Sequence, residues 1–361
     1  MAEACIERPD VHELEVVLFG PGYGECILLH VGRGYWIVVD SCMHGRNEPV
    51  ALKYLNQLGL DPSEAIKAVI ATHWHEDHIR GMAAILQTCP NADFCCAGAL
   101  TKNEFFSFLS ISSGESFTSS GLGAREFMRI ITILHERRQL PKYAVQNRKM
   151  LQFADCEIWS LSPTDGAYEK FLRMAAGLIV ADSPRRKQNF RLTPNQVSVS
   201  LMVNIGGDQV LLGADLDGSG WKGILNDYPH PTRRASLYKV AHHGSASGDV
   251  PGIWTRLLKP DPHAVLTPWQ RGDGMLPSAE DVKRILKRTP NAWITQIQPT
   301  RPARKRTRAS AVEKLVRRKD SRPRPLQPVF GYIRLRRNLI NGGEWKVVTE
   351  GRAGHLTDYR P

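Results

Sequence analysis

The sequence predicts a mixed α+β (α/β) fold in which metal-binding side chains lie at the ends of short strands. Apolar segments of strand length alternate with amphipathic segments of helical period. Several of the strand segments end in Asp or His, residue types whose oxygen and nitrogen atoms bind divalent metals. With 361 residues and 42% hydrophobic content, the chain is long enough to bury a sizeable core around such strands.

The first part of the chain is expected to form strands interrupted by two helices. A tight loop, Gly-Tyr-Gly-Glu at 22–25, separates the first two strands, and no helix follows it, so it is not a phosphate-binding loop. We predict strands at 13–19, 26–31, 35–39, 68–72 and 93–96, and helices at 48–58 and 79–86.

Residues 101–191 differ in character from what precedes them and are predicted to be a helical insertion over the core. The stretch is rich in serine at its start and then shows helical patterns at 124–139 and 166–180. Beyond it, the core is expected to resume with a hairpin. We predict further strands at 198–205, 209–213, 237–241, 263–267 and 293–296, and a helix at 279–288.

The most informative segment is residues 73–78, which follow a predicted strand and read His-Trp-His-Glu-Asp-His. A strand that turns sharply into a helix can direct several side chains to one point, and imidazoles with a carboxylate suit Zn²⁺, Mn²⁺ or iron. Later strand ends supply more such groups, namely Asp215 and the pair His242 and His243. Together these side chains predict a metal site.

The pattern His73-x-His75-x-Asp77-His78 after a hydrophobic strand resembles the signature of the metallo-β-lactamase fold superfamily. Further motifs make the chain similar to the ComEC-type metallohydrolase and nuclease domain of competence proteins. They are Gly-Glu-Cys-Ile-Leu at 24–28, Asn-Gln-Val-Ser at 195–198, Gly-Ala-Asp at 213–215, and Lys-Val-Ala-His-His-Gly-Ser at 239–245. The resemblance covers about residues 13–300 and implies a four-layer αββα sandwich.

The resemblance also implies two divalent metal ions, Zn²⁺ or Mn²⁺, with Asp215 as the bridge between them. Asp40 would orient a ligand from outside the coordination sphere. Asp77, Asp215 and His243 would act in catalysis, with His243 facing the substrate and a metal-bound hydroxide as the nucleophile. The implied metal ligands are His73, His75, Asp77, His78, Asp215 and His242.

One feature departs from the general pattern of the family. A separate histidine usually lies between the first motif and the bridging Asp, whereas here only His135 lies in that interval, within a predicted helix. The first ion would then keep open positions, which favours Mn²⁺ or exchangeable Zn²⁺ and leaves a one-metal site as an alternative.

The positive charge of the chain is concentrated near its C-terminus. Of a net charge of +12, residues 301–324 carry +9, because they contain eleven Lys or Arg and two acidic residues. Such a segment favours a polyanionic partner, and we predict nucleic acid, with DNA favoured over RNA. An ordinary basic surface is the alternative. The predicted nucleic-acid-binding residues are Arg304, Lys305, Arg306, Arg308, Arg317, Arg318 and Lys319.

The domain organisation expected from these features is a metallo-β-lactamase-fold domain at 1–300, a basic linker at 301–326 and a C-terminal β-hairpin at 327–361 packed on the main domain. No apolar run reaches the ~18 residues of a membrane helix, and the polar N-terminus does not resemble a signal peptide. Seven scattered cysteines are typical of free thiols in a reducing compartment. We therefore predict a cytoplasmic protein with no membrane partner.

Three functions are compatible with the sequence. A metal-dependent nuclease or phosphodiesterase accounts for both the metal motif and the basic segment, and it is the function we predict. The alternative is a metallohydrolase of a small molecule, such as a cyclic nucleotide, a phosphorylcholine ester or a lactone. A non-catalytic module that binds nucleic acid or a partner is a further alternative, but it would have no need for six metal-binding side chains. By analogy at the level of the fold, a regulatory partner protein is also an expectation.

Overall fold

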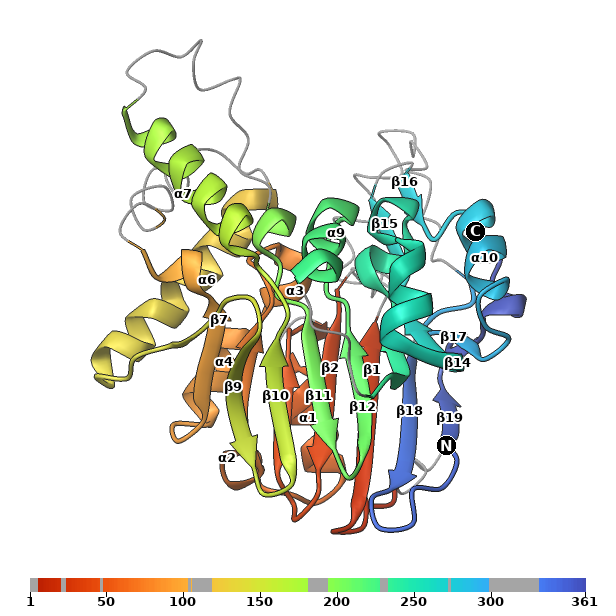
Figure 1. The fold of residues 1–361 in the computed structure, drawn as a ribbon. Coiled ribbons are helices and arrows are strands. Elements are labelled where there is room, and N and C mark those ends of the chain that lie inside the picture. The colour runs from red at the N-terminus through yellow and green to blue at the C-terminus, as the bar shows by residue number, and fades with distance from the viewer. Residues whose placement is uncertain are drawn as a thin grey trace, which may run out of the picture.

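The computed structural model describes residues 6–20, 24–45, 48–102, 105, 119–180, 194–227, 233–271, 274–298 and 331–361. Two eight-stranded sheets form the centre of this part of the chain (Figure 1). The basic linker at 301–326, and with it every predicted nucleic-acid-binding side chain, lies outside the described residues.

The first sheet takes strands from both ends of the chain, in the order β19-β18-β1-β2-β3-β6-β7-β8. Its N-terminal strands are antiparallel neighbours, whereas β3, β6, β7 and β8 run parallel. The strands are β1 (Glu13–Gly20), β2 (Cys26–Val31), β3 (Trp36–Val39), β6 (Ile66–Ala71), β7 (Asp93–Ala97), β8 (Lys142–Ala144), β18 (Gly331–Asn338) and β19 (Lys346–Glu350).

The second sheet has the order β20-β17-β14-β13-β12-β11-β10-β9, and its strands β12, β13, β14 and β17 run parallel. Its strands are β9 (Arg148–Phe153), β10 (Cys156–Ser160), β11 (Leu201–Ile205), β12 (Asp208–Leu212), β13 (Ala235–Lys239), β14 (Leu258–Leu266), β17 (Ala292–Ile294) and β20 (Gly354–His355). Two short ribbons, β4 with β5 (Met43–His44, Glu48–Pro49) and β15 with β16 (Trp269–Arg271, Gly274–Leu276), lie outside both sheets.

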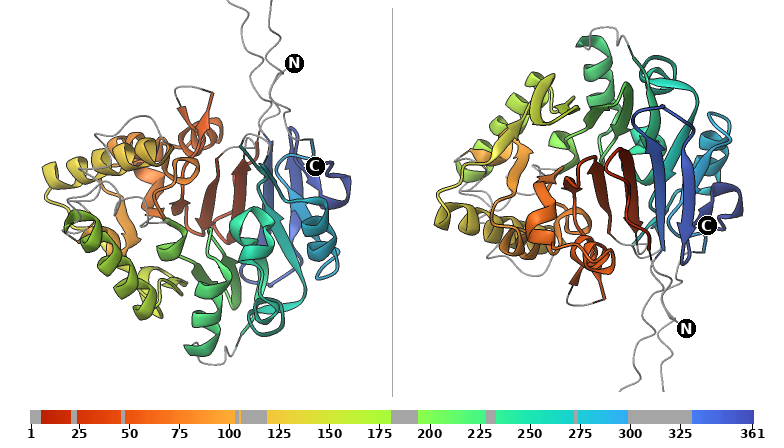
Figure 2. Two further views of the ribbon diagram at one scale, coloured as in Figure 1. Left: turned by 90° about the horizontal axis from the view of Figure 1, so that it is seen from above. Right: turned by 90° about the horizontal axis from the view of Figure 1, so that it is seen from below.

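The sheets pack face to face, and helices cover their outer faces (Figure 2). One apolar core joins the two sheets and includes Tyr54 of α1, whereas a second core joins the second sheet to Trp221 of α9 and Ile285 of α10. Because both faces of the central strands are covered, they are apolar nearly throughout instead of alternating. The helices are α1 (Val50–Gln57), α2 (Pro62–Ala65), α3 (Glu76–Ile79), α4 (Met82–Thr88), α6 (Ser119–Glu136), α7 (Asp165–Val180), α9 (Gly218–Asp227) and α10 (Ala279–Leu286).

The stretch at 101–191, predicted to be an insertion, supplies part of the sandwich itself. It contains β8 of the first sheet and β9 and β10 of the second, in addition to α6 and α7. The described part of this stretch is therefore not purely helical, and the boundaries of the insertion stay a prediction. Its strands are short, and the continuous burial that marks the central strands is lost at the edge strand β9, where exposed and buried residues are mixed.

The helix predicted at 79–86 is two helices in the structure. Helix α3 already begins at Glu76 and ends at Ile79, and α4 begins at Met82. Between them Gly81 adopts φ 86°, a left-handed conformation that interrupts the helix and that glycine adopts without steric cost.

The C-terminal hairpin extends the first sheet. Strand β18 runs antiparallel along the whole of β1, from the pair Glu13 and Asn338 to the pair Gly20 and Gly331. Strand β19 then pairs with β18, and β20 joins the edge of the second sheet at β17. The residues after the basic linker thus contribute to both sheets.

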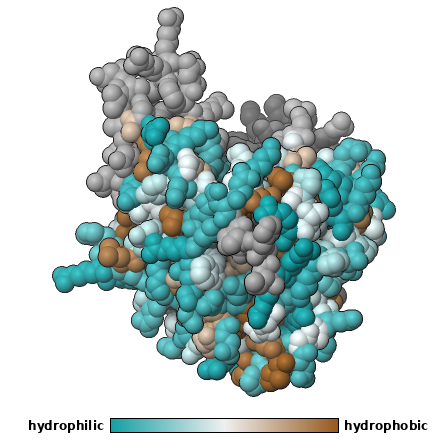
Figure 3. Space-filling model, viewed as in Figure 1, coloured by the Kyte–Doolittle hydropathy of each residue, from teal (hydrophilic) through white to brown (hydrophobic). Residues whose placement is uncertain are grey.

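The face of the molecule in Figure 3 is largely hydrophilic, and its hydrophobic residues form small, separate patches. Among the described helices, none has the length and apolar character required to cross a membrane. The six described cysteines are free and buried.

The buried His30 in β2 should make the free energy of unfolding decrease at mildly acidic pH. Burial lowers its pKa from 6.5 to about 4, and the neutral ring is fixed by Nδ1–H donation to the Glu13 carbonyl (2.8 Å) and by Nε2 acceptance from Gly34 N–H (3.1 Å). Because the folded pKa lies below the unfolded one, the contribution is complete above pH 6.5 and is lost as the pH falls toward 4. We expect the loss to reach about 3 kcal/mol.

Urea unfolding of the wild type and of His30→Gln at a series of pH values from 7.5 to about 4.5 tests this prediction, since other titrating groups affect both proteins alike. The difference in unfolding free energy between the two should shrink as the pH falls. A difference that is independent of pH would contradict it.

Candidate metal centre

The candidate site lies at the edge of the sandwich where parallel strands of both sheets end. The segments directly after β3, β6, β12 and β13 carry Asp40, the His-x-His-x-Asp-His residues, Asp215 and the histidine pair, respectively. Parallel neighbours end at one edge of a sheet, so these segments are adjacent in space, and such edges commonly form binding sites.

The His-Trp-His segment after β6 sends its side chains in two directions. His75 has extended dihedral angles (φ −63°, ψ 145°), and in an extended segment alternate side chains point to the same side. His73 Nε2 lies 3.0 Å from His75 Nδ1. Trp74 instead packs in an aromatic cluster with Phe105 and Phe171, at ring-centroid distances of 4.8 and 5.6 Å. The tryptophan thereby anchors the segment while both imidazoles face the site.

Asp40 is the acceptor for three hydrogen bonds beneath the site. Its Oδ1 accepts from the Thr72 N–H, and its Oδ2 accepts from the Thr72 hydroxyl and from His78 Nδ1–H, each at 2.8 Å. Thr72 Oγ1 in turn lies 2.9 Å from His73 Nδ1 and accepts a hydrogen bond from its N–H. Asp40 thus fixes His78 directly and His73 through Thr72, so that both rings present Nε2 to the site. This geometry is compatible with the orienting role predicted for Asp40.

Asp215 lies at the centre of the cluster. Its Oδ2 is 3.4 Å from His78 Nε2, 3.6 Å from His243 Nε2 and 4.0 Å from His73 Nε2. Its Oδ1, His78 Nε2 and His243 Nε2 are all buried without a hydrogen-bond partner. Buried polar atoms without partners are costly, and a shared cation would satisfy all three. The residues present therefore fit a divalent metal.

Overlapping sets of side chains have the arrangement that a metal ion requires. In each set, the potential ligand atoms lie within 4.8 Å of one another. The sets are His73 with His78 and Asp215, Asp77 with His78 and His243, and Glu25 with Asp40 and His78. His78 belongs to all three sets, so its imidazole is the side chain that they share.

The structure separates the two histidines that follow β13. His243 is buried, and its Nε2 lies 3.8 Å from Asp77 Oδ2 in addition to its contact with Asp215. His242 is half-buried, with Nδ1 3.0 Å from Ser247 Oγ and Nε2 3.5 Å from Asn195 Nδ2.

The described geometry favours His243 over His242 as a metal ligand. From the sequence we predict that His242 binds the metal and that His243 faces the substrate, whereas His243 is the one that lies in a potential ligand set. The cause is the backbone, which is left-handed at both residues (φ 50° and 52°) and turns the second imidazole back into the site.

Burial and neighbouring charges shift the pKa values of the site residues in different directions. Burial lowers the pKa of His73 well below its ordinary value. Burial also acts to lower the pKa of His78, but the carboxylates of Asp215 and Asp40 outweigh it and raise that pKa well above the ordinary value. Burial acts to raise the pKa of Asp215, yet His78 and His243 hold it well below its ordinary value. The site thus contains an ionised carboxylate facing imidazole nitrogens, a donor set that suits divalent metals.

Left-handed backbone is concentrated around this cluster. Asp40, Ala214, His242 and His243 have φ values of 59°, 46°, 50° and 52°. Non-glycine residues rarely adopt this conformation, and they gather at functional sites where the surrounding structure holds them. Their position is independent support for a site at this edge.

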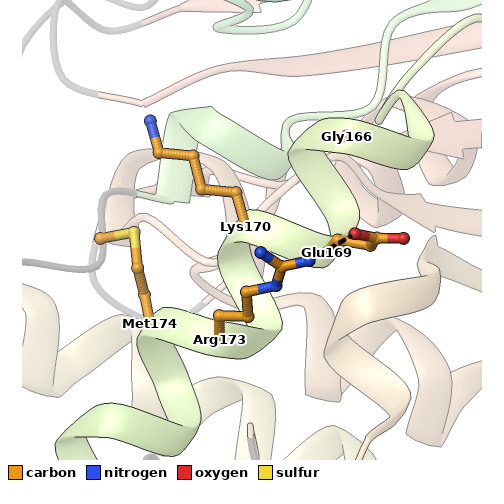
Figure 4. A pocket seen from close by; sticks show the side chains of 5 residues that line it. All are labelled: Gly166, Glu169, Lys170, Arg173 and Met174. Atoms are coloured by element: carbon orange, nitrogen blue, oxygen red, sulfur yellow. Dashed lines mark hydrogen bonds and ion pairs between the residues drawn. The ribbon is translucent and has the colours of Figure 1, made fainter.

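A surface hollow on α7 is a weaker candidate. Its volume is about 260 Å³, and its lining comes from one helix (Figure 4). Arg173 is already paired with Glu169 at 3.0 Å. The residues that line the hollow are Gly166, Glu169, Lys170, Arg173 and Met174. Because none of them is a predicted ligand, the strand-end cluster remains the candidate site.

Part of the chain matches the model of a known protein family. A family model described as the metallo-beta-lactamase superfamily matches residues 19–132, a span that contains Asp40 and the His-x-His-x-Asp-His segment. The chain contains a metallo-beta-lactamase superfamily domain. The predicted fold class is thereby confirmed, and the two facing sheets with outer helices are the sandwich of this family.

Individual proteins similar to the metallo-beta-lactamase domain were found among curated sequences and solved structures. A hydroxyacylglutathione hydrolase of Prochlorococcus marinus is 31% identical over 98 residues, which are 27% of this chain and 35% of that protein, so the match spans about a third of its length. The metallo-beta-lactamase fold protein YhfI of Bacillus subtilis aligns with a TM-score of 0.37 and 12% identity, covering 78% of this chain and 95% of YhfI. A mutant metallo-beta-lactamase of Cronobacter sakazakii aligns with a TM-score of 0.35 and 10% identity, covering 62% of this chain and 75% of that one.

The metallo-beta-lactamase domain also places residues beside the cluster to which sequence reasoning assigns no role. They are Thr72, Glu25 and Thr267. A signal was present for Glu25, since an acidic residue directly before a continuous apolar strand is unusual. For the two threonines no signal existed, because Thr is common at strand ends and in strands.

Proposed function

We propose that the protein is a metal-dependent hydrolase that cleaves the phosphodiester bonds of nucleic acid. The observation that carries the hydrolase part is the convergence of buried, unpartnered atoms of His78, Asp215 and His243 on one point. The assignment to the ComEC-type group belongs to this proposal and rests on the sequence motifs around 24–28, 195–198 and 239–245.

The site would hold one or two divalent ions, Zn²⁺ or Mn²⁺. Because Asp40 occupies Nδ1 of His78, only Nε2 of that ring can bind an ion, so two ions must divide the remaining ligands. We assign His73 and His75 to one ion, since their facing nitrogens are 3.0 Å apart. The other ion would take Asp77, His78 and His243, with Asp215 between the two.

The chain's own residues prepare this site for hydrolysis. A bound divalent cation would lower the pKa of a coordinated water and stabilise negative charge on a phosphate. Asp40 holds the proton on His78 Nδ1, and the buried position of Asp215 excludes bulk water from the centre. The half-buried imidazole of His242 remains accessible to solvent and would contact the substrate.

The polymer substrate is inferred from the basic segment at 301–324. The nearest described residue on its C-terminal side, Gly331, pairs with Gly20 at the end of β1. A Cβ on Gly20 would lie 2.5 Å from Thr267 Cγ2, and Thr267 Oγ1 contacts His243 Nδ1 at 3.0 Å. The first described residue after the segment therefore lies at the edge of the sheets that bears the site, which supports a role of the segment in holding the substrate.

A second candidate function is hydrolysis of a small thioester. The similarity to a hydroxyacylglutathione hydrolase favours it, and the same metal site would serve. The segment at 301–324, with its net charge of +9, favours nucleic acid as the substrate instead, because hydrolysis of a small thioester does not require a basic segment. We propose that the protein acts in the cytoplasm, and a regulatory partner protein remains part of the proposal.

The proposal predicts that cleavage of a polymer, but not of a small phosphodiester, depends on the basic segment. The wild type should cleave supercoiled plasmid or single-stranded RNA with Mn²⁺ or Zn²⁺ and should be inactive in EDTA. Neutralising four charges of the segment should weaken polymer binding and lower the log–log salt slope by up to about 4, with hydrolysis of bis(p-nitrophenyl) phosphate unchanged. The test variant combines Arg304→Ala, Lys305→Ala, Arg306→Ala and Arg308→Ala.

The matched control removes four exposed positive charges from elsewhere on the described surface. It combines Lys142→Ala, Lys149→Ala, Arg173→Ala and Lys283→Ala. We expect it to cleave the polymer as the wild type does. Rapid hydrolysis of a hydroxyacylglutathione without cleavage of either polymer would reject the nuclease proposal and favour the second candidate.

A further inference from the structure

A buried ion pair lies directly beneath the candidate metal centre. Glu25 Oε1 is 2.6 Å from Lys239 Nζ, and both side chains are 1% exposed. We infer that Glu25, together with Thr267 and Lys239, positions His243 and holds the two sheets in register at the metal centre. The inference rests on the metal-dependent function proposed above, and it assigns these three residues to positioning, not to catalysis.

The first arm of this group orients His243. Glu25 Oε2 accepts a hydrogen bond from the Thr267 hydroxyl at 2.6 Å. Because that hydroxyl donates to Glu25, its oxygen is free to accept from His243 Nδ1–H at 3.0 Å. The proton is thereby held on Nδ1, and the lone pair of Nε2, which has no hydrogen-bond partner, faces Asp77 and Asp215. This relay corresponds to the hydrogen bonds by which Asp40 orients His78 directly and His73 through Thr72.

The second arm reaches the segment that carries the proposed bridge. Lys239 Nζ donates to the Ala214 carbonyl at 3.2 Å, one residue before Asp215 and at a left-handed position of the backbone. In addition, the backbone N–H of Glu25 donates to the Asp77 carbonyl at 2.8 Å. A single glutamate therefore contacts, directly or through one residue, the segments that hold three of the proposed ligands.

The group also connects the two sheets at the site. Glu25 directly precedes β2 of the first sheet, whereas Lys239 ends β13 and Thr267 follows β14 of the second. A buried charge pair is a weak source of stability, and apolar residues of similar volume would stabilise such an interface at least as well. Its presence beside the site, with Oε1 of Glu25 in the ion pair and Oε2 hydrogen-bonded to Thr267, favours a positioning role over a purely structural one.

The test uses substitutions at Thr267, which carry no charge and preserve the fold better than changes of the ion pair. Thr267→Val removes the hydroxyl and keeps the shape, and Thr267→Ser restores the hydroxyl. Thr295→Val is the matched control, because Thr295 is also buried and its hydroxyl has no partner. The measurement is the affinity for Zn²⁺ by competition with a chromophoric chelator, with thermal unfolding of the metal-free proteins recorded in parallel.

We expect Thr267→Val to weaken binding of the ion that His243 holds about 10- to 100-fold. Thr267→Ser and Thr295→Val should leave the affinity for that ion within about threefold of the wild-type value. The effect should disappear in a His243→Ala background, since the relay acts through that ring. Wild-type affinity in a folded Thr267→Val variant, or equal losses in Thr267→Val and Thr295→Val, would overturn the inference. The measurement needs no substrate, so the positioning role of Thr267 can be tested even if the protein does not cleave nucleic acid.

Discussion

Replacing Asp215 with alanine is expected to abolish metal binding and to lower hydrolysis by more than about 100-fold. The carboxylate faces three imidazole nitrogens within 4.0 Å, and no other described acid has this position. Substitution of residues outside the coordination sphere typically costs 10- to 100-fold, and loss of the central ligand should exceed that range. Metal affinity, ion content and phosphodiester hydrolysis are the quantities to measure.

The melting temperature of Asp215→Ala provides a second test, which does not require the substrate to be known. A ligand that binds only the folded state stabilises it by about 2.7 kcal/mol at 100 times its dissociation constant. Zn²⁺ or Mn²⁺ should therefore raise the melting temperature of the wild type but not of Asp215→Ala. Asp155→Asn, which changes an exposed aspartate with an 87% exposed side chain, is the control and should respond like the wild type. An equal shift in all three proteins would place the metal elsewhere.

Asp40→Asn is expected to weaken metal binding about 10- to 100-fold while preserving the fold. Asparagine has nearly the same shape, and it tolerates the left-handed φ of 59° at this position. The oxygen of the amide can still accept from the Thr72 N–H, but the new NH₂ group would face His78 Nδ1. His78 must then accept at Nδ1 and carry its proton on Nε2, the atom that should bind the metal.

The tautomer change gives Asp40→Asn a specific readout. Nuclear magnetic resonance of ¹⁵N-labelled histidine distinguishes protonation at Nδ1 from protonation at Nε2. We expect the metal-free wild type to carry a proton on His78 Nδ1 and the variant to lose it. Unchanged metal affinity in a folded Asp40→Asn protein would show that Asp40 is a structural residue and not an orienting one.

Much of the site could be predicted from local sequence because it is built from regular strand ends. The His-x-His spacing places both imidazoles on one side of an extended segment, and Asp40 and Asp215 each follow a predicted strand directly. These residues converge because parallel strands share an edge, which is a property of the fold and does not require atomic detail.

The remaining features depend on geometry that sequence spacing does not determine. His242 and His243 are adjacent and lie in left-handed backbone, so no periodic rule indicates which one turns inward. Glu25 and Thr267 are 242 residues apart and meet only when the sheets pack. The strands between 142 and 160 lie at or next to the edges of the sheets, where mixed burial weakens the hydrophobic pattern, and for this reason the sequence predicts an insertion there.

The most direct test of the central claim is to locate the metal. Crystals grown with Mn²⁺ or Zn²⁺ would be measured by anomalous diffraction at the absorption edge of that element. We predict one or two strong peaks within coordination distance of Asp215 and His78, with His243 and not His242 as the ligand from the histidine pair. Peaks confined to other surfaces, or no peak at this cluster in crystals that contain the metal, would contradict the account.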